Sequence, residues 1–200
     1  MSGTGTSALL FRYTVMSGQN DADGISLGGS ISLNGGTMKN SSLLDAVLTL
    51  SGVGSTTGIL VDAIAPTVSS VSSSTANGTY KTGDVIAVTI TFTEAVTVTG
   101  TPTLALNSGG SASYASGSGT STLTFNYTIG SSNSSADLNY PATNSLALAG
   151  GTIKDAAGNN ATLTLPAVGG GSSLGGQKNI VIDGVAPTVS SVGVPSMVLI

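Results

Sequence analysis

Three residue types are missing from this sequence of 200 residues, which contains no cysteine, no histidine and no tryptophan. Without cysteine the chain has neither disulfide bonds nor thiolate metal ligands. Without histidine it lacks imidazole acid–base chemistry and the catalytic groups that join histidine to cysteine or serine. These absences exclude most enzyme classes, and we expect that the protein is not an enzyme.

Charged residues are also scarce, at 7% of the chain. Five basic and nine acidic side chains give a net charge of −4. Five cations cannot form the basic stripe that neutralises nucleic-acid phosphates, so we expect no nucleic-acid partner. An apolar share of 40% with so little charge is typical of a chain that folds.

Long apolar runs are absent too, since none approaches the roughly 20 residues of a membrane-spanning helix. Residues 1–15 lack the basic start and the small-residue cleavage site of a signal peptide. We therefore expect no membrane insertion. A chain without cysteine is typical of large bacterial surface proteins, which favours a secreted or cell-surface location.

The main feature that is present is an internal repeat. Val61–Val71 recurs as Ile182–Val192, and Pro66 and Pro187 are 187 − 66 = 121 residues apart. Two further matches align Phe11–Val15 with Phe125–Ile129 at an offset of 114, and Gly35–Lys39 with Gly150–Lys154 at an offset of 115. A fixed period of this length predicts tandem modules. The chain divides into the second half of one repeat (residues 1–61), a complete repeat (62–182) and the start of a third (183–200).

Apolar residues alternate with threonine and serine at a period of two, which predicts strands with one buried face. In the complete repeat Ile86, Val88, Ile90 and Phe92 share one face, while Thr89 and Thr91 point to solvent. Leu123, Phe125, Tyr127 and Ile129 form a second such strand, with Thr124 and Thr128 exposed. Shorter strands are expected at Val96–Val98, Leu104–Leu106, Leu146–Leu148, Thr152–Ile153, Leu163–Leu165 and Ile180–Ile182.

The number and spacing of these strands predict an all-β fold, an antiparallel β-sandwich of the immunoglobulin-like type. No helix is expected, and the Gly/Ser-rich stretch Ala167–Lys178 is predicted to be a loop. The rival fold is a β-solenoid, because Thr-x-Thr pairs such as Thr91/Thr93 and Thr97/Thr99 resemble threonine ladders. Solenoid coils repeat every 20–30 residues or so, and nothing in the chain repeats on that scale.

The first repeat holds only half of the predicted strands. These are Leu9–Val15, Ser30–Leu33 and Val47–Leu50, and the sequence before them has no counterpart of Ile86–Phe92. We therefore expect the chain to be a fragment of a longer one. Residues 1–60 should be poorly ordered or completed by strands of a neighbouring molecule, whereas 66–186 should fold alone.

Five ordered motifs of the complete repeat resemble the bacterial immunoglobulin-like repeats that occur in tandem in large surface proteins and adhesins. They are Tyr80–Ile86, Phe92–Leu104, Gly117–Thr120, Leu123–Tyr127 and Asp155–Asn159. The resemblance covers the whole of Pro66–Pro187 and part of Leu10–Val61. It implies a spacer function and no particular ligand. The first repeat departs from the pattern, because residues 40–45 stand where Asp155–Asn159 stands in the second.

Asp62 and Asp183 are the first candidate metal ligands, since each stands just before the Ala-Pro-Thr of a repeat boundary. Ca²⁺ takes six to eight oxygen ligands, and a junction can recruit them from both modules. The alternative is a turn, because aspartate followed by small residues before proline is favourable turn chemistry.

Asp155 and Asn159 are a second candidate, because they place side-chain oxygens on either side of a glycine that permits a sharp bend. This loop can ligate Ca²⁺ or form an Asx turn. Asp21–Gly24 opens like an EF-hand loop, but its glycine is at position four and no glutamate follows at position twelve.

Asp84 and Glu94 complete the candidate set, one at the start and one at the end of a predicted strand. Paired carboxylates are the machinery of glycosidases. However, the chain has no tryptophan to stack a sugar and only 4% aromatic residues, so a calcium or turn role is favoured for both.

These observations favour a structural function, a spacer module of a large secreted or cell-surface bacterial adhesin-like protein. Its partners are then the neighbouring repeats of the same chain, with Ca²⁺ as the one expected cofactor. The alternative is a binding module whose loops at one end of the sandwich contact a cell-surface glycan or protein. Sparse aromatic residues favour the spacer.

Overall fold

The computed structural model describes residues 2–193. The chain divides into two compact units, Met1–Ile64 (unit 1) and Ala65–Ile200 (unit 2). The expected third repeat begins inside unit 2, and its residues 194–200 lie outside the described residues.

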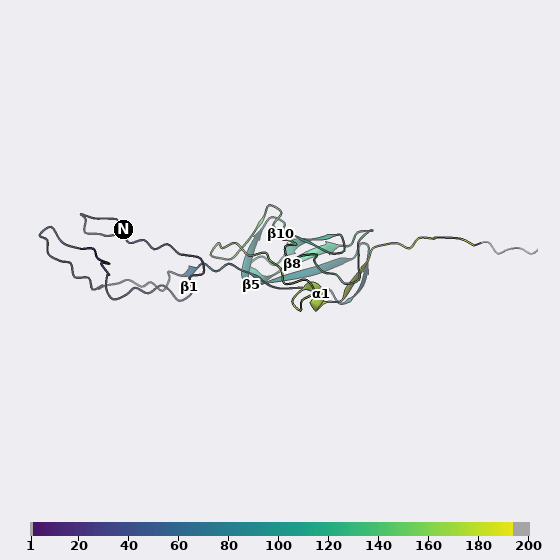
Figure 1. Cartoon of the computed structure of the whole chain (residues 1–200), viewed down its shortest axis with the longest axis horizontal. Coiled ribbons are helices and arrows are strands. Elements are labelled where there is room, and N and C mark those ends of the chain that lie inside the picture. Colours follow the sequence, from purple (N-terminus) through teal and green to yellow (C-terminus); the bar gives the residue numbers. More distant parts are fainter. Residues whose placement is uncertain (1, 194–200) are drawn as a thin grey trace, which may run out of the picture. The chain divides into compact units, whose positions relative to one another are not determined.

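Unit 2 is built from strands with a single short helix among its described residues (Figure 1). The strands are β3 (Val68–Ser73), β4 (Gly78–Lys81), β5 (Val85–Thr99), β6 (Thr103–Ala105), β7 (Ser111–Ser116), β8 (Thr120–Thr128), β9 (Ser134–Ser135), β10 (Leu146–Ala147), β11 (Thr152–Lys154) and β12 (Ile180–Asp183). The larger sheet has the order β10-β6-β7-β8-β5-β11, with β3 also paired to β5. The smaller sheet has the order β4-β12-β9. All neighbours are antiparallel except β4 and β12, which are parallel.

The strands β5 and β8 form the centre of the larger sheet, and their alternating pattern follows the sequence. Val88 lies opposite Phe125, and Ile86 lies opposite Tyr127. All seven apolar residues expected in the core are no more than 2% exposed, which confirms the predicted register. They are Ile86, Val88, Ile90, Phe92, Leu123, Phe125 and Tyr127.

Both sheets contribute to one hydrophobic core. Ile180 and Ile182 of β12 belong to the same buried cluster as the apolar residues of β5 and β8. Burying one apolar face of each sheet in this way removes both faces from water. The predicted all-β class is confirmed, and the arrangement is sandwich-like.

The threonines between the core residues differ in part from the prediction. Thr89, Thr91 and Thr124 are half-buried, and only Thr128 is exposed. The reason is that β5 and β8 are central strands, so side chains of adjacent strands cover each threonine. Thr91 and Thr122, for example, face each other with their hydroxyl oxygens 3.4 Å apart.

Several element boundaries also differ from the prediction. β5 is one strand of 15 residues rather than two, because its second part continues past a register shift and pairs with β11. Leu163–Leu165 forms no strand, since it has no ladder partner beyond single bonds such as Leu165 N–H to the Thr143 carbonyl. The serine-rich strands β3 and β7 lack the apolar alternation that marks β5.

A short helix, α1 (Leu174–Gln177), lies in the stretch expected to be a loop. The Ser173 hydroxyl caps it by accepting a hydrogen bond from the Gly176 N–H. Leu174 is fully buried in the core, so the helix is held by tertiary packing rather than by its two internal glycines.

Unit 1 has little regular structure among its described residues 2–64. Its strands β1 (Asn20–Asp21) and β2 (Val61–Asp62) pair antiparallel. The three strands expected there are reduced to isolated bridges, such as Ser30 with Thr49. No described residue of unit 1 is buried, because no second sheet lies against these segments within the unit.

Unit 1 nevertheless repeats the local hydrogen bonds of unit 2 at the offsets seen in the sequence. The Ala63 N–H donates to the Gln19 carbonyl at 2.9 Å, and the Gly184 N–H donates to the Asn133 carbonyl at 2.9 Å. The β1–β2 pair has the register of the β9–β12 pair, since Asn20 with Asp62 matches Ser134 with Asp183.

The same correspondence extends over most of unit 1. Four backbone N–H to C=O hydrogen bonds of unit 1 each match one of unit 2. In unit 1 they are Thr6 to Gly3, Gln19 to Met16, Gly36 to Leu33 and Ala46 to Met38. Their counterparts in unit 2, in the same order, are Thr120 to Gly117, Asn133 to Gly130, Gly151 to Leu148 and Ala161 to Ile153. The bridge of Ser2 with Leu10 matches the β7–β8 pair of Ser116 with Thr124. Residues 2–63 thus have the local structure of residues 116–184.

Candidate metal centre

Glu94 and Asp155 come together where β5 pairs with β11. Lys154 is the register partner of Thr97, so Asp155 follows β11 beside the C-terminal part of β5. Each residue offers a carboxylate oxygen within 4.8 Å of the other. Glu94 is half-buried and Asp155 is 5% exposed. Two negative charges this close repel each other unless donors or a cation compensate them.

Asp155 is held by its own loop. The Asn159 N–H donates to Asp155 Oδ1 at 2.8 Å, and the Asn159 amide Nδ2 donates to Oδ2 at 2.7 Å. These bonds form an Asx turn, which the sequence indicated as the alternative to a metal site in this loop. A carboxylate oxygen accepts more than one bond, so the turn is compatible with a metal ligand at the same residue.

The loop also determines the charge of Asp155. Burial by itself raises the pKa of the carboxyl, but hydrogen bonds from the Asn159 side chain and from the backbone of Asn159, Gly158 and Ala157 outweigh it. The pKa of Asp155 is therefore held below its usual value. At neutral pH the group is a carboxylate, the form that ligates a hard cation.

The start of unit 2 lies beside Glu94. The Thr67 N–H donates to Thr93 Oγ1 at 3.1 Å, and the Thr93 N–H donates to the Thr67 carbonyl at 2.9 Å, so unit 2 starts next to Glu94. Glu94 and Asp155 make up the acidic group of unit 2, and their carboxylate oxygens are the atoms that could hold a metal ion.

Asp62 and Asp183 each form the turn predicted at a repeat boundary. The Ile64 N–H donates to Asp62 Oδ1 at 3.1 Å, and the Val185 N–H donates to Asp183 Oδ1 at 3.4 Å. Asp183 ends β12 and is not part of the acidic group.

Asp84 lies in the turn between β4 and β5, away from the acidic group. Its Oδ2 accepts the Lys81 N–H at 2.9 Å, and its Oδ1 is 3.6 Å from Lys81 Nζ. Ten residues of strand separate Asp84 from Glu94, roughly 33 Å at the rise of an extended chain. Glycosidase carboxylates are about 5–10 Å apart, so these two do not form such a pair.

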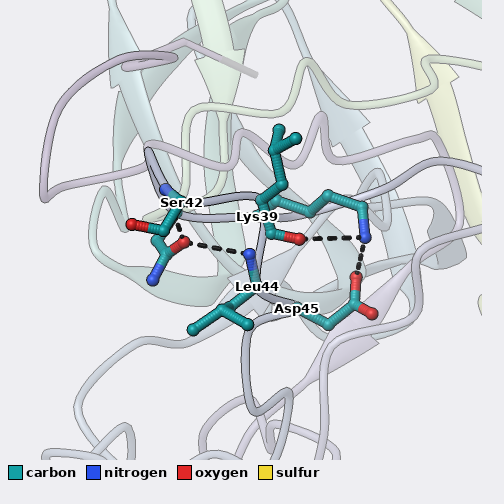
Figure 2. A network of polar contacts seen from close by, with 6 residues as sticks. Lys39, Ser42, Leu44 and Asp45 are labelled. Atoms are coloured by element: carbon teal, nitrogen blue, oxygen red, sulfur yellow. Dashed lines mark hydrogen bonds and ion pairs between the residues drawn. The ribbon is translucent and has the colours of Figure 1, made fainter.

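The corresponding loop of unit 1 has a matching backbone-to-side-chain hydrogen bond, but its acceptor is a neutral residue. Figure 2 shows the network around Lys39, Ser42, Leu44 and Asp45. The Leu44 N–H donates to Asn40 Oδ1 at 3.0 Å, as Asn159 does to Asp155. Lys39 Nζ also lies 2.6 Å from Asp45 Oδ1. Asn40 is neutral where Asp155 is charged, so this loop offers no carboxylate at the equivalent position.

Sequence reasoning selected Asp62, Glu94 and Asp155 individually but did not predict that Glu94 and Asp155 meet. The two are far apart in the sequence, and only the β5–β11 register brings them together. The period-two alternation continues through Glu94. This pattern would have indicated one long strand.

Comparisons of the chain with protein-family models, with curated proteins and with solved structures find no match. Within residues 2–193, no helix has the length and hydrophobicity needed to cross a membrane.

Proposed function

We propose that the chain is a tandem structural module of the immunoglobulin-like type, a spacer of a large secreted or cell-surface bacterial adhesin-like protein. The observation that supports this proposal is that the same pattern of backbone hydrogen bonds recurs at offsets of 114, 115 and 121 residues. The chain therefore forms the same local structure twice. Each copy ends in a strand and an Asx turn that lead toward Ala-Pro-Thr. Repetition with short proline-containing connections suits a protein that extends by adding modules.

The acidic group gives the spacer a way to stiffen. Glu94 and Asp155 lie beside the start of unit 2. A Ca²⁺ ion bound by Glu94 and Asp155 would relieve the repulsion between the two carboxylates and restrict the residues at the start of unit 2. The remaining ligands would be water or backbone carbonyls.

Mechanical stretching of the full chain between its two ends tests the spacer function. Unit 2 should unfold in one cooperative event that releases about 120 residues, close to 400 Å of chain, and should refold when the force is removed. Gradual extension without such an event would contradict the proposal. So would tight binding of a glycan or protein in a surface-ligand screen, which would favour a binding module.

Melting of the full chain in EDTA and in excess Ca²⁺ tests the metal part. A ligand that binds only the folded state at 100 times its Kd adds about 2.7 kcal/mol of stability. This gain should be present in the wild type and in Asp84→Asn, and absent in Glu94→Gln and Asp155→Asn. Asn40 already supports the same loop in unit 1, so Asp155→Asn removes charge while keeping the turn. Identical transitions with and without Ca²⁺ would exclude the metal.

A further inference from the structure

The apolar residues of unit 1 are exposed where their counterparts in unit 2 are buried. Phe11 is 54% exposed and Phe125 is fully buried; Tyr13 is 69% exposed and Tyr127 is 1% exposed. The pairs Val15 with Ile129 and Ile59 with Ile180 show the same contrast. The difference therefore comes from what packs against these positions and not from the residue types.

In unit 2 the covering elements are known. Phe125 lies between Val88 of β5 and Tyr114 of β7, its register partners on either side. Residues 2–63 correspond to 116–184, so they contain no counterpart of β3 to β6 and only that of the last residue of β7. Phe11–Val15 accordingly lies outside any strand of the described chain.

A hollow of about 510 Å³ in unit 1 marks where one of these elements would lie. Its lining includes Tyr13, Gln19 and Asn20, the counterparts of Tyr127, Asn133 and Ser134. In unit 2 all three of those residues contact the turn between β6 and β7.

That turn fits closely. The Ser108 hydroxyl donates to the Tyr127 hydroxyl at 2.8 Å, and the Ser134 N–H donates to the Ser108 carbonyl at 3.2 Å. A Cβ atom on Gly110 would collide with the ring of Tyr127, so only glycine allows this approach. The hollow beside Tyr13 has the position and polar lining that such a turn requires.

We propose that unit 1 is a docking surface for the first half of another module of this type, a segment with the strand pattern of β3 to β7. Its β6–β7 turn would fill the hollow, with a serine hydroxyl donating to Tyr13. Its β5-like and β7-like strands would pair on either side of Phe11–Val15 and cover their apolar side chains. This inference rests on the repeat in the proposed function but not on Ca²⁺ or on the spacer role.

The test is a chain in which a copy of residues 65–115 is fused directly before Ser2, compared with a chain carrying the same segment in scrambled order. Hydrogen exchange should slow at least tenfold across Leu9–Val15 in the first chain and stay unchanged in the second. Protection of Leu123–Ile129 serves as the internal control, since unit 2 is the same in both.

A second readout uses the absence of tryptophan from the natural chain. With Phe11→Trp, the emission should shift to shorter wavelength in the fused chain and remain that of exposed indole in the scrambled one. Unchanged exchange and emission in the fused chain would overturn the proposal. It would also be overturned if light scattering found the unfused chain to be a dimer in which Leu9–Val15 is already protected, because the occupant would then be a second copy. Neither result depends on whether Ca²⁺ binds or on how the chain responds to mechanical force.

Discussion

The two units have the same turns and different interiors. In both, an Asx-type side chain accepts a hydrogen bond from the backbone of its loop. A left-handed residue closes each loop, Leu43 at φ 63° in unit 1 and Gly158 at φ 96° in unit 2. Only unit 2 has buried apolar residues among those described. Turns need bonds within a few residues of each other, whereas a core needs strands that are distant in the sequence.

The contrast also separates two sources of stability. An exposed local hydrogen bond contributes little, since water offers an equivalent bond to the unfolded chain. Burying a large apolar side chain contributes about 1.5–3 kcal/mol. Unit 2 should therefore hold nearly all of the stability of the chain.

Truncation of matched phenylalanines gives the largest expected difference between the units. Phe125→Ala should lower the free energy of unfolding by about 3–5 kcal/mol, because it leaves a cavity in the core. Phe11→Ala, at the corresponding position of unit 1, should change it by less than about 0.5 kcal/mol. Urea unfolding followed by circular dichroism measures both. Equal losses would mean that unit 1 closes a core of its own.

Lowering the pH should affect the Asp155 loop of unit 2 but not the Asn40 loop of unit 1. The expected change in the free energy of unfolding is smaller than that of the phenylalanine substitutions. The pKa of Asp155 is lowered in the folded state, so its contribution is complete above the unfolded value of about 3.9 and is lost as the pH falls through the folded value. Asp155→Asn should be less stable than the wild type by about 1 kcal/mol at pH 7. The two should converge as the pH falls through the folded-state pKa of Asp155.

The matched control for this titration is Asn40→Ala in unit 1, which removes the corresponding loop acceptor without removing a charge. Its stability should follow the pH dependence of the wild type. A constant difference between Asp155→Asn and the wild type from pH 7 to pH 3 would show that the ionised form of Asp155 is not the stabilising one.

The outward threonines of unit 2 give the smallest expected effect. Thr124 is half-buried between adjacent strands, so Thr124→Ala should cost about 0.2–1 kcal/mol. Thr128→Ala, at an exposed position of the same strand, should stay within about 0.5 kcal/mol of the wild type. Losses as large as that of Phe125→Ala, measured by the same urea titration, would place these threonines in the core and shift the register by one residue.

The sequence alone determined the all-β class and the inward residues of β5 and β8, because strand faces alternate strictly with residue number. It also located the turns at Asp62 and Asp155, whose bonds reach only two to four residues along the chain.

Only the tertiary structure decided how far β5 extends, that Leu174 begins a helix, and that Glu94 lies beside Asp155. Each of these depends on a partner far away in the sequence: β11 for the end of β5 and for Glu94, and the core for Leu174. The burial of Phe125 and the exposure of Phe11 follow the same rule. Almost identical local sequences have opposite environments, because burial is a property of the strands that pack against a residue and not of the residue itself.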